Sequence, residues 1–380
     1  MRRRLITVLL VAGLSMAAQE LAVDAGQSTQ KPATPGINWA QATPGFRFEF
    51  PRDHGSHPDF KLEWWYYTGN LDARDGRRFG YQLTFFRVGV EPRPANPSRW
   101  AIRDLFLAHF AVTDVSGRQF RFSDRVNRAG IGWAGAATET YRVWNDDWQA
   151  YRDGARHILR ARTDEVAIAL QLGEGDAPVL HGSGGVSRKG QSAGNASYYY
   201  SLPRMPTEGT VTIGGATFAV SGASWMDHEF GTTLLEAHQR GWNWFAVQLD
   251  DGTELMLYEL TRDDGSRDPH SSGTLIDQDG RTGSLAATQF QLEPGRRWRS
   301  SASGGTYPTA WRIRVPQADL ILDVSAVIDD QELRTDRSTG VTYWEGAIDI
   351  TGSRAGRDVS GRGYLEMTGY VGNSLATVLH

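Results

Sequence analysis

The sequence predicts an all-β protein built from two tandem antiparallel β-barrels, and three observations lead to this fold class. Runs of alternating apolar and polar residues follow one another, with Gly- and Asp-rich turns between many of them. Helical periodicity is nearly absent from the 380 residues. A hairpin pattern, in which a Trp pair leads through an Asp-Gly turn into an apolar return strand, occurs at 63–86 and again at 242–260. This recurrence, nearly half a chain apart, predicts two related β domains.

The N-terminus has the pattern of a secretory signal peptide, which we place at residues 1–25. A basic start from Met1 to Arg4 precedes an apolar run at 5–18 that ends in small residues. The run is shorter than the roughly 20 residues that cross a bilayer, which argues against the alternative of an uncleaved anchor. The chain has no Cys, so it carries neither a lipobox nor a disulfide. We therefore expect a secreted or periplasmic protein.

A leader at 26–45, rich in Ala, Gln, Thr and Pro, is expected to be flexible, and the first β domain is expected at 46–235. The domain opens with an alternating strand at 46–50 and a turn-rich loop at 51–59. His54 and His57 in this loop are an incomplete set of metal ligands, and loop hydrogen bonding is the alternative role, so no metal is assigned. The first hairpin follows, with its turn at Asp75-Gly76. Further strands are expected at 105–113, 119–122, 156–161, 166–172 and 197–202.

The second β domain is expected at 236–380 and begins with the second hairpin, whose turn is Asp251-Gly252. Later strands are expected at 273–276, 287–292, 311–315, 320–327, 341–346 and 362–370. The segment 224–231 lies where the two domains meet. Ligand sites are common at such junctions.

The candidate catalytic residues begin in this segment. In an extended strand Asp227 and Glu229 share one face, while His228 points to the other. A carboxylate placed among the rings of Trp225 and Phe230 is desolvated, which raises its pKa and suits it to donate a proton. The alternative is that these groups pair across a sheet edge and only hold a linker in place.

Aromatic residues supply the candidate ligand-binding surface. The chain has 13 Trp, and several of them cluster with carboxylates near the two hairpins. Buried indoles need partners for their N–H groups, and such a supply is compatible with a large apolar ligand site. The candidate ligand-binding residues are Trp225, Glu63, Trp64, Trp65, Tyr67, Trp242, Trp244 and Trp344.

Charge and motifs argue against other classes of function. The net charge is −4 and no cluster of Lys and Arg is interleaved with aromatic residues, so nucleic-acid binding is not expected. No Gly-x-Ser-x-Gly elbow is present, which excludes an α/β-hydrolase. Ser224 precedes His228 by four residues, but strand spacing does not bring their side chains together for a hydrolase triad.

Three segments resemble the AttH/carotenoid hydratase family: the loop at 51–60, Glu63-Trp64-Trp65-Tyr66-Tyr67-Thr68-Gly69, and Trp225-Met226-Asp227-His228-Glu229. The resemblance extends from Phe48 to Tyr370 and includes the segment 343–346. It implies two tandem lipocalin-like barrels and a hydrophobic ligand. In the pigment-pathway branch it implies hydration of an isolated carbon–carbon double bond without a redox cofactor. The leader is similar to that of an uncharacterised exported branch.

The resemblance also implies residue roles. Asp227 matches the acid that protonates the alkene, and Trp225 matches an aromatic residue two positions earlier. Where that branch has His-x-Trp about a strand earlier, this chain has a run of three tyrosines, so Tyr198 and Tyr200 join the candidates. Tyrosines can hydrogen-bond a water molecule or stabilise a cation through their rings.

Two main classes of function remain open, and a secreted hydrolase is a further alternative. One is a non-catalytic carrier of a lipid-like or isoprenoid-like molecule, with export or transport proteins as partners. The other is a cofactor-independent enzyme, hydratase or cyclase-like, that uses Asp227 as its acid.

Overall fold

The computed structural model describes residues 38–92, 96–98, 100–192, 194–233 and 235–372, all within one compact unit that begins at Asn38. The expected signal peptide and the first part of the leader lie outside these residues. The rest of the leader is packed: Ala42 is buried, and the Thr43 backbone N–H donates to the Tyr198 hydroxyl at 3.0 Å. Among the described residues, no helix is long and apolar enough to cross a membrane.

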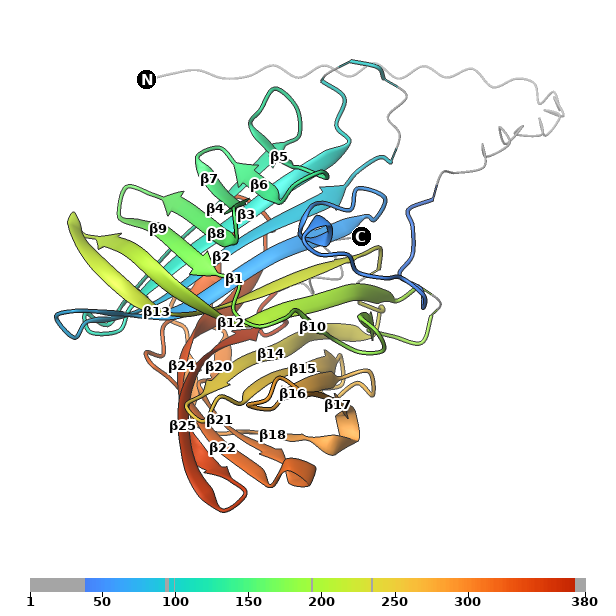
Figure 1. The fold of residues 1–380 in the computed structure, drawn as a ribbon. Coiled ribbons are helices and arrows are strands. Elements are labelled where there is room, and N and C mark those ends of the chain that lie inside the picture. Colours follow the sequence, from blue (N-terminus) through green and yellow to red (C-terminus); the bar gives the residue numbers. More distant parts are fainter. Residues whose placement is uncertain (1–37, 93–95, 99, 193, 234, 373–380) are drawn as a thin grey trace, which may run out of the picture. The chain divides into compact units, whose positions relative to one another are not determined.

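The all-β prediction is confirmed, because the only helices in the described residues are three short 3₁₀ turns. They are η1 (Arg52–His54), η2 (Ala287–Gln289) and η3 (Pro316–Ala318). The strands form two large antiparallel sheets, coloured blue to yellow-green and yellow to red in Figure 1. Both hairpin turns form as predicted, with Gly76 and Gly252 at φ +86° and +83°, a left-handed conformation that glycine adopts without strain.

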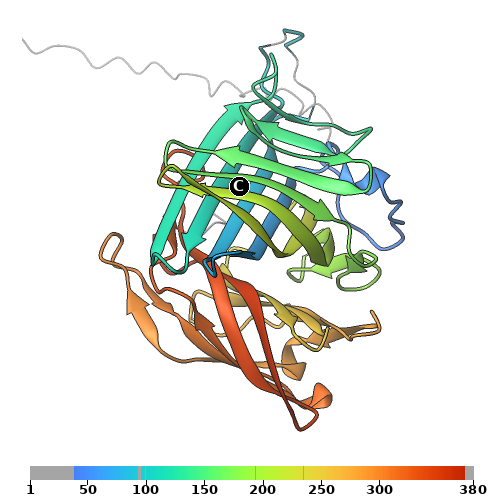
Figure 2. The same cartoon turned by 60° about the vertical axis from the view of Figure 1, so that its left-hand side comes forward.

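The first sheet has 13 strands in the order β4-β3-β2-β1-β13-β12-β9-β8-β7-β6-β5, with β10 and β11 paired to β12. A bridge between Ala129 and Ala134 links its two ends, so the sheet is a nearly closed barrel (Figure 2). Its strands are β1 (Leu62–Ala73), β2 (Arg78–Gly89), β3 (Asp104–Asp114), β4 (Gln119–Arg128), β5 (Ala134–Ala136), β6 (Arg142–Asn145), β7 (Trp148–Asp153), β8 (Arg156–Arg162), β9 (Val166–Gly173), β10 (Val179–Leu180), β11 (Val186–Arg188), β12 (Ala196–Ile213) and β13 (Ala216–Gly231).

The second sheet has 10 strands in the order β17-β16-β15-β14-β25-β24-β22-β21-β18, with β23 paired to β24. Its strands are β14 (Gln239–Leu249), β15 (Glu254–Arg262), β16 (Ser272–Ile276), β17 (Thr282–Ala286), β18 (Gln291–Pro294), β21 (Ala310–Val315), β22 (Leu320–Ala326), β23 (Glu332–Arg334), β24 (Thr342–Arg354) and β25 (Arg357–Met367), beside a separate pair of β19 (Arg297–Arg299) and β20 (Thr306–Pro308).

The two sheets repeat one topology. In the first, the hairpin β1–β2 is followed outward by β3 and β4, and β1 pairs on its other side with β13 and then β12. In the second, β14–β15 is followed by β16 and β17, and β14 pairs with β25 and then β24. The repeated hairpin in the sequence therefore corresponds to equivalent elements of the two sheets. The sheets separate between Gly231 and Gln239, close to the expected domain boundary.

Alternation along the strands divides the side chains among three cores. Trp65, Tyr67 and Tyr200 point into the first barrel, and Phe245 and Trp344 point into the second sheet. A third cluster, which includes Tyr66, Trp225, Trp244 and Tyr364, fills the space between the two sheets. Polar contacts also cross this boundary: the Asn70 side-chain amide donates to the Gly363 carbonyl at 3.1 Å, and the Thr113 hydroxyl donates to the Gln331 amide oxygen at 2.7 Å.

Two expected strands differ in the structure. Residues 46–50 join no sheet; their alternating rings instead pack on the barrel, where Phe46 stacks on Tyr198 with ring centroids 4.3 Å apart. The segment 287–292 begins as the helix η2 and only then becomes β18. In both cases alternation reflects packing of side chains without a hydrogen-bonded partner strand along the whole segment.

Candidate functional site

A cavity of about 120 Å³ lies between the outer face of the first sheet and the facing side of the second. Its walls are largely apolar, and aromatic rings come from both sheets. They belong to Trp64, Tyr66, Phe86, Tyr199, Trp242, Trp244, Tyr258 and Tyr343. The acidic and basic side chains that line the same space are Glu63, Arg87, His109, Lys189, Asp227, Glu229, Glu345 and Glu366. An apolar cavity with a few converging polar groups is the usual form of a small-molecule site.

Asp227 reaches the cavity from β13 because the strand alternates. Asp227 and Glu229 point outward into the cavity, while His228 between them points into the barrel, as the sequence predicted. Asp227 is only 4% exposed. Its carboxylate accepts hydrogen bonds from the Tyr199 and Ser201 hydroxyls and from the Trp225 indole N–H, the last at 2.6 Å. These three donors fix the orientation of the carboxyl group.

Burial raises the pKa of Asp227 to about 7. The three donors work in the opposite direction because they favour the carboxylate, and the negative charge of Glu229 adds to the increase. A group with a pKa near neutrality holds its proton in a substantial fraction of molecules and releases it readily. This is the property that a general acid requires.

Glu229 has a different environment from Asp227. Lys189 lies 3.0 Å from its Oε1, and the Ser197 hydroxyl donates to the same carboxylate. The Lys189 ammonium also lies 4.1 Å from the ring centroid of Tyr258. Burial works to lower the pKa of Lys189, but Glu229, Tyr258 and Asp227 together outweigh burial and the pKa is raised. The two groups therefore form a charged pair in the cavity wall.

The second sheet supplies two acids that the sequence did not single out. Burial raises the pKa of Glu366 to about 7, with added repulsion from Asp227 and Glu229. Burial and the charge of Glu366 raise the pKa of Glu345 well above its usual value. Glu345 Oε1 and the Tyr66 hydroxyl are buried, and neither has a partner of good hydrogen-bond geometry in the described ranges. The Tyr66 hydroxyl is still close enough to Glu345 to work against the increase in the pKa of that carboxyl group. Unpaired polar atoms in a cavity wall are available to a ligand.

Asp227 and Glu366 lie on equivalent strands of the two sheets. Asp227 on β13 lies opposite Tyr66 on β1, and Glu366 on β25 lies opposite Trp244 on β14. β13 and β25 are the equivalent neighbours of the two hairpins. Each sheet thus places one acid beside one aromatic ring, on the strand that pairs with the first strand of its hairpin.

The structure brings only part of the predicted site together. Asp227, Glu229, Trp64, Trp242 and Trp244 line the cavity. Trp225 is buried behind it and holds Asp227 through its indole N–H. Tyr199, a residue that the sequence did not select, contacts both Asp227 and the Trp244 indole N–H. The tyrosine that faces the acid is therefore the middle one of the three.

The other predicted residues lie elsewhere, because each points to the face of its strand opposite the one that lines the cavity. They are His228, Trp65, Tyr67, Tyr200 and Trp344, which point into the sheets, and Tyr198, which packs under the Phe46 segment. Glu63 borders the cavity, but its fully buried carboxylate is held by Arg87, His57 and His228 on the interior side. The contacts of Glu63 with Arg87, His57 and His228 therefore support β13 structurally. This agrees with the alternative interpretation, in which the segment 224–231 has a structural role.

The fold and the site define a β-sheet protein with an acidic, aromatic cavity between two topologically related sheets. Comparison with known families matches residues 41–370 to the AttH-like family, and the chain belongs to this family. This confirms the resemblance to AttH proteins seen in the sequence.

Three known proteins are similar to the chain. The crystal structure of an AttH protein from Nitrosomonas europaea is 35% identical, with a TM-score of 0.79, and the match covers 87% of this chain and 100% of that one. Kievitone hydratase from Nectria haematococca is 16% identical, with a TM-score of 0.67 and coverage of 85% and 93%, and shares the fold. Dehydratase asqC from Emericella nidulans is 21% identical over 231 residues, which span 59% of this chain and 63% of that enzyme. Similar proteins therefore include enzymes that add or remove water.

Proposed function

We propose that this protein binds a hydrophobic small molecule in the cavity between its sheets and adds water to, or removes water from, that molecule, with Asp227 as the general acid of the hydration direction. The observation that carries the proposal is the buried Asp227 carboxyl group, whose pKa is raised to about 7 in an aromatic cavity. Similarity to a hydratase and a dehydratase supports the same class of reaction.

In the hydration direction, Asp227 donates its proton to one carbon of the double bond. The neighbouring carbon becomes positive and is stabilised by the faces of nearby rings, such as Tyr199 and Trp244. Water then bonds to that carbon and releases a proton to a carboxylate, for which Glu366 on the facing wall is placed. In the dehydration direction the same steps run in reverse: protonated Glu366 donates to the leaving hydroxyl, and the Asp227 carboxylate removes a proton from the adjacent carbon.

The remaining groups of the cavity suit recognition of the substrate. The charged Lys189–Glu229 pair can orient a carbonyl or hydroxyl group, while the indoles of Trp64 and Trp242 cover apolar carbons. No step of this scheme uses a redox cofactor. The substrate class is a largely apolar molecule with one polar end.

The test is to incubate the purified protein with a panel of lipophilic alkenes and their tertiary alcohols in ¹⁸O-labelled water. Liquid chromatography with mass spectrometry detects the gain or loss of one water molecule and the incorporated label. Turnover that depends on the protein supports the enzyme.

The second candidate function is a carrier without chemistry, which the largely apolar lining of the cavity favours. A carrier retains an apolar ligand through purification and releases it unchanged. Native mass spectrometry of the intact protein would then show a bound lipid, and the alkene panel would show no product.

We also propose that the protein is exported. The basic-then-apolar start supports cleavage between Gln19 and Gly26. N-terminal sequencing of protein recovered from a periplasmic extract is expected to begin in that interval. Recovery of a chain that still begins at Met1 in the membrane fraction would contradict the proposal.

A further inference from the structure

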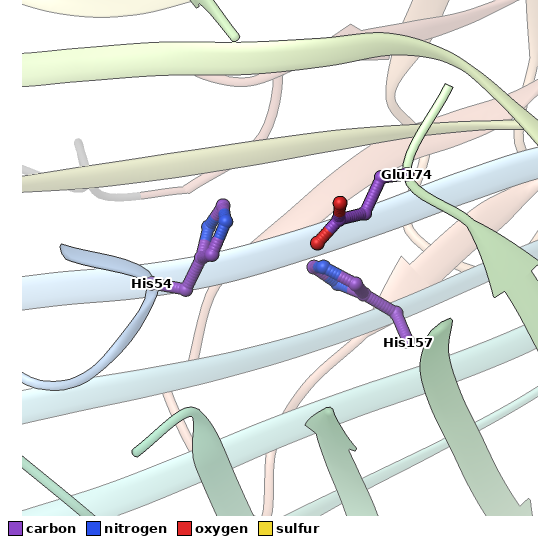
Figure 3. Close-up of side chains that lie close together, drawn as sticks. All are labelled: His54, His157 and Glu174. Carbon is purple, nitrogen blue, oxygen red and sulfur yellow. The ribbon is translucent and has the colours of Figure 1, made fainter. Parts of the chain in front are cut away.

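A second cluster of ligand-type side chains lies on the interior side of the first barrel, whereas the cavity lies on its outer side. It consists of His54 at the end of η1, His157 on β8, and Glu174 immediately after β9. One donor atom from each residue lies within 4.8 Å of the other two. Figure 3 shows both imidazoles and the carboxylate facing a common space. None of the three lines the cavity between the sheets.

A tyrosine hydroxyl contacts the Nδ1 atom of each of the two imidazole rings. The Tyr200 hydroxyl lies 2.7 Å from Nδ1 of His54, and the Tyr67 hydroxyl lies 2.9 Å from Nδ1 of His157. Such contacts fix the ring orientation and leave Nε2 of each ring for another partner. Nε2 of His157 is buried and has no hydrogen-bond partner in the part of the chain that the structure describes. A buried ring nitrogen that is held in a fixed orientation and has no hydrogen-bond partner is available to bind a ligand.

The two imidazole rings are withdrawn from solvent, since His54 is 3% exposed and His157 is 0% exposed. Neutral imidazole and carboxylate are common ligands of zinc.

The positive charge of Arg152 competes with a metal ion for the Glu174 carboxylate. Its guanidinium forms an ion pair with Glu174, and its Nε is buried without a partner among the residues described. A metal ion would have to share the Glu174 carboxylate with Arg152 or displace it. The Glu174 side chain is 39% exposed at the end of its strand and has room to turn.

We propose that His54, His157 and Glu174 form a binding site for a zinc-type divalent metal ion, with Tyr200 and Tyr67 holding the two imidazoles. Two nitrogens and one carboxylate oxygen are a known zinc ligand set that leaves a fourth position for water. Bonds of about 2.0 to 2.2 Å place tetrahedral donors roughly 3.3 to 3.5 Å apart, so the three side chains must close by about 1 Å. The neighbouring group His57, Glu63 and His228 is unsuited, because Arg87 and mutual hydrogen bonds already occupy its donors. This inference does not depend on the reaction in the cavity.

The test uses untagged protein that has been treated with a chelator and then dialysed. Isothermal titration with Zn²⁺ is expected to show one ion per chain, and Co²⁺ is expected to give the visible absorption of a tetrahedral site. His157→Gln and Glu174→Gln should each weaken binding more than about 100-fold, and Tyr67→Phe by about 10- to 100-fold. The control His270→Gln, which changes a histidine beside Asp268, should leave binding unchanged.

One variant tests the proposal in the opposite direction. Arg152→Gln removes the competing charge while the three ligands remain, so zinc should bind more tightly than to the wild type. Unchanged or weaker binding by this variant would contradict the site. Absence of zinc uptake and of the cobalt spectrum in the folded wild-type protein would overturn the proposal, even if the ligand variants fail to fold.

Discussion

Asp227→Asn is expected to lower the rate of hydration or dehydration by at least about 100-fold, because the amide can neither donate a proton to carbon nor remove one from it. The fold should survive. The Asn oxygen can accept from Trp225 and Ser201, and its NH₂ group can donate to the Tyr199 oxygen in place of Asp227 Oδ2. Rates from the ¹⁸O assay and melting curves of the same protein check both statements.

The pH dependence provides an independent readout of the same group. Because the folded pKa is about 7 and the unfolded value is near 3.9, the wild type loses stability as pH rises from about 4 to 7, where only the unfolded chain releases its proton. Asp227→Asn should lack this loss and melt at an equal or higher temperature than the wild type at pH 8. Wild-type activity should fall as pH rises through about 7.

The matched control is Asp323→Asn, which changes a half-exposed carboxylate on the second sheet. It should leave the rate unchanged. If Asp227→Asn keeps full activity, the acid assignment is wrong. If it instead unfolds the protein at pH 8, Asp227 is a structural support.

The largest loss of stability is expected from Arg87→Met. Arg87 is 2% exposed and contacts Glu63 at 3.0 Å, Asp104 at 3.0 Å and the backbone carbonyls of His57 and Phe60. Removing the guanidinium leaves the Glu63 carboxylate charged in the barrel interior. Breaking a buried ion pair in this way costs about 3–5 kcal/mol of unfolding free energy. Urea unfolding at pH 7 measures the difference.

The comparison pair is Arg156 and Glu208, whose side chains are 56% and 66% exposed. Arg156→Met should cost less than about 1 kcal/mol. The pKa of Glu63 is held well below its usual value: burial alone would raise it, and Arg87 with the two histidines outweighs burial. The stabilisation by this pair is therefore present above the unfolded pKa of about 4.3 and is lost as pH falls further. A cost at pH 7 no larger than that of Arg156→Met would refute the role of this network.

The fold could be read from the sequence because its signals are local. Alternation and an Asp-Gly turn define a hairpin within 25 residues or so, and the second hairpin repeats them. The prediction of a strand at the aromatic segment 46–50 was wrong, because alternation shows which side chains pack but not whether a partner strand exists.

The site was harder to predict because it depends on register and on the packing of the sheets. Asp227 and Glu229 follow from one strand alone. Choosing Tyr199 over its neighbours requires the pairing of β12 with β13, in which Tyr199 lies opposite Glu229. Glu366 belongs to the opposite wall, more than a hundred residues away, and only the contact between the sheets brings it near Asp227. Alternation in the segment 364–367, where Tyr364 and Glu366 share a face, was the one available signal.

The placement of Asp227 and Glu366 on equivalent strands has a consequence for how such a cavity diversifies. The repeated topology gives the chain two copies of one strand arrangement, each with an acid beside an aromatic ring. One copy can keep its donors and its proton-giving role while substitutions in the other reshape the opposite side. Selection for a new ligand can therefore act on one half of the molecule without dismantling the acid in the other.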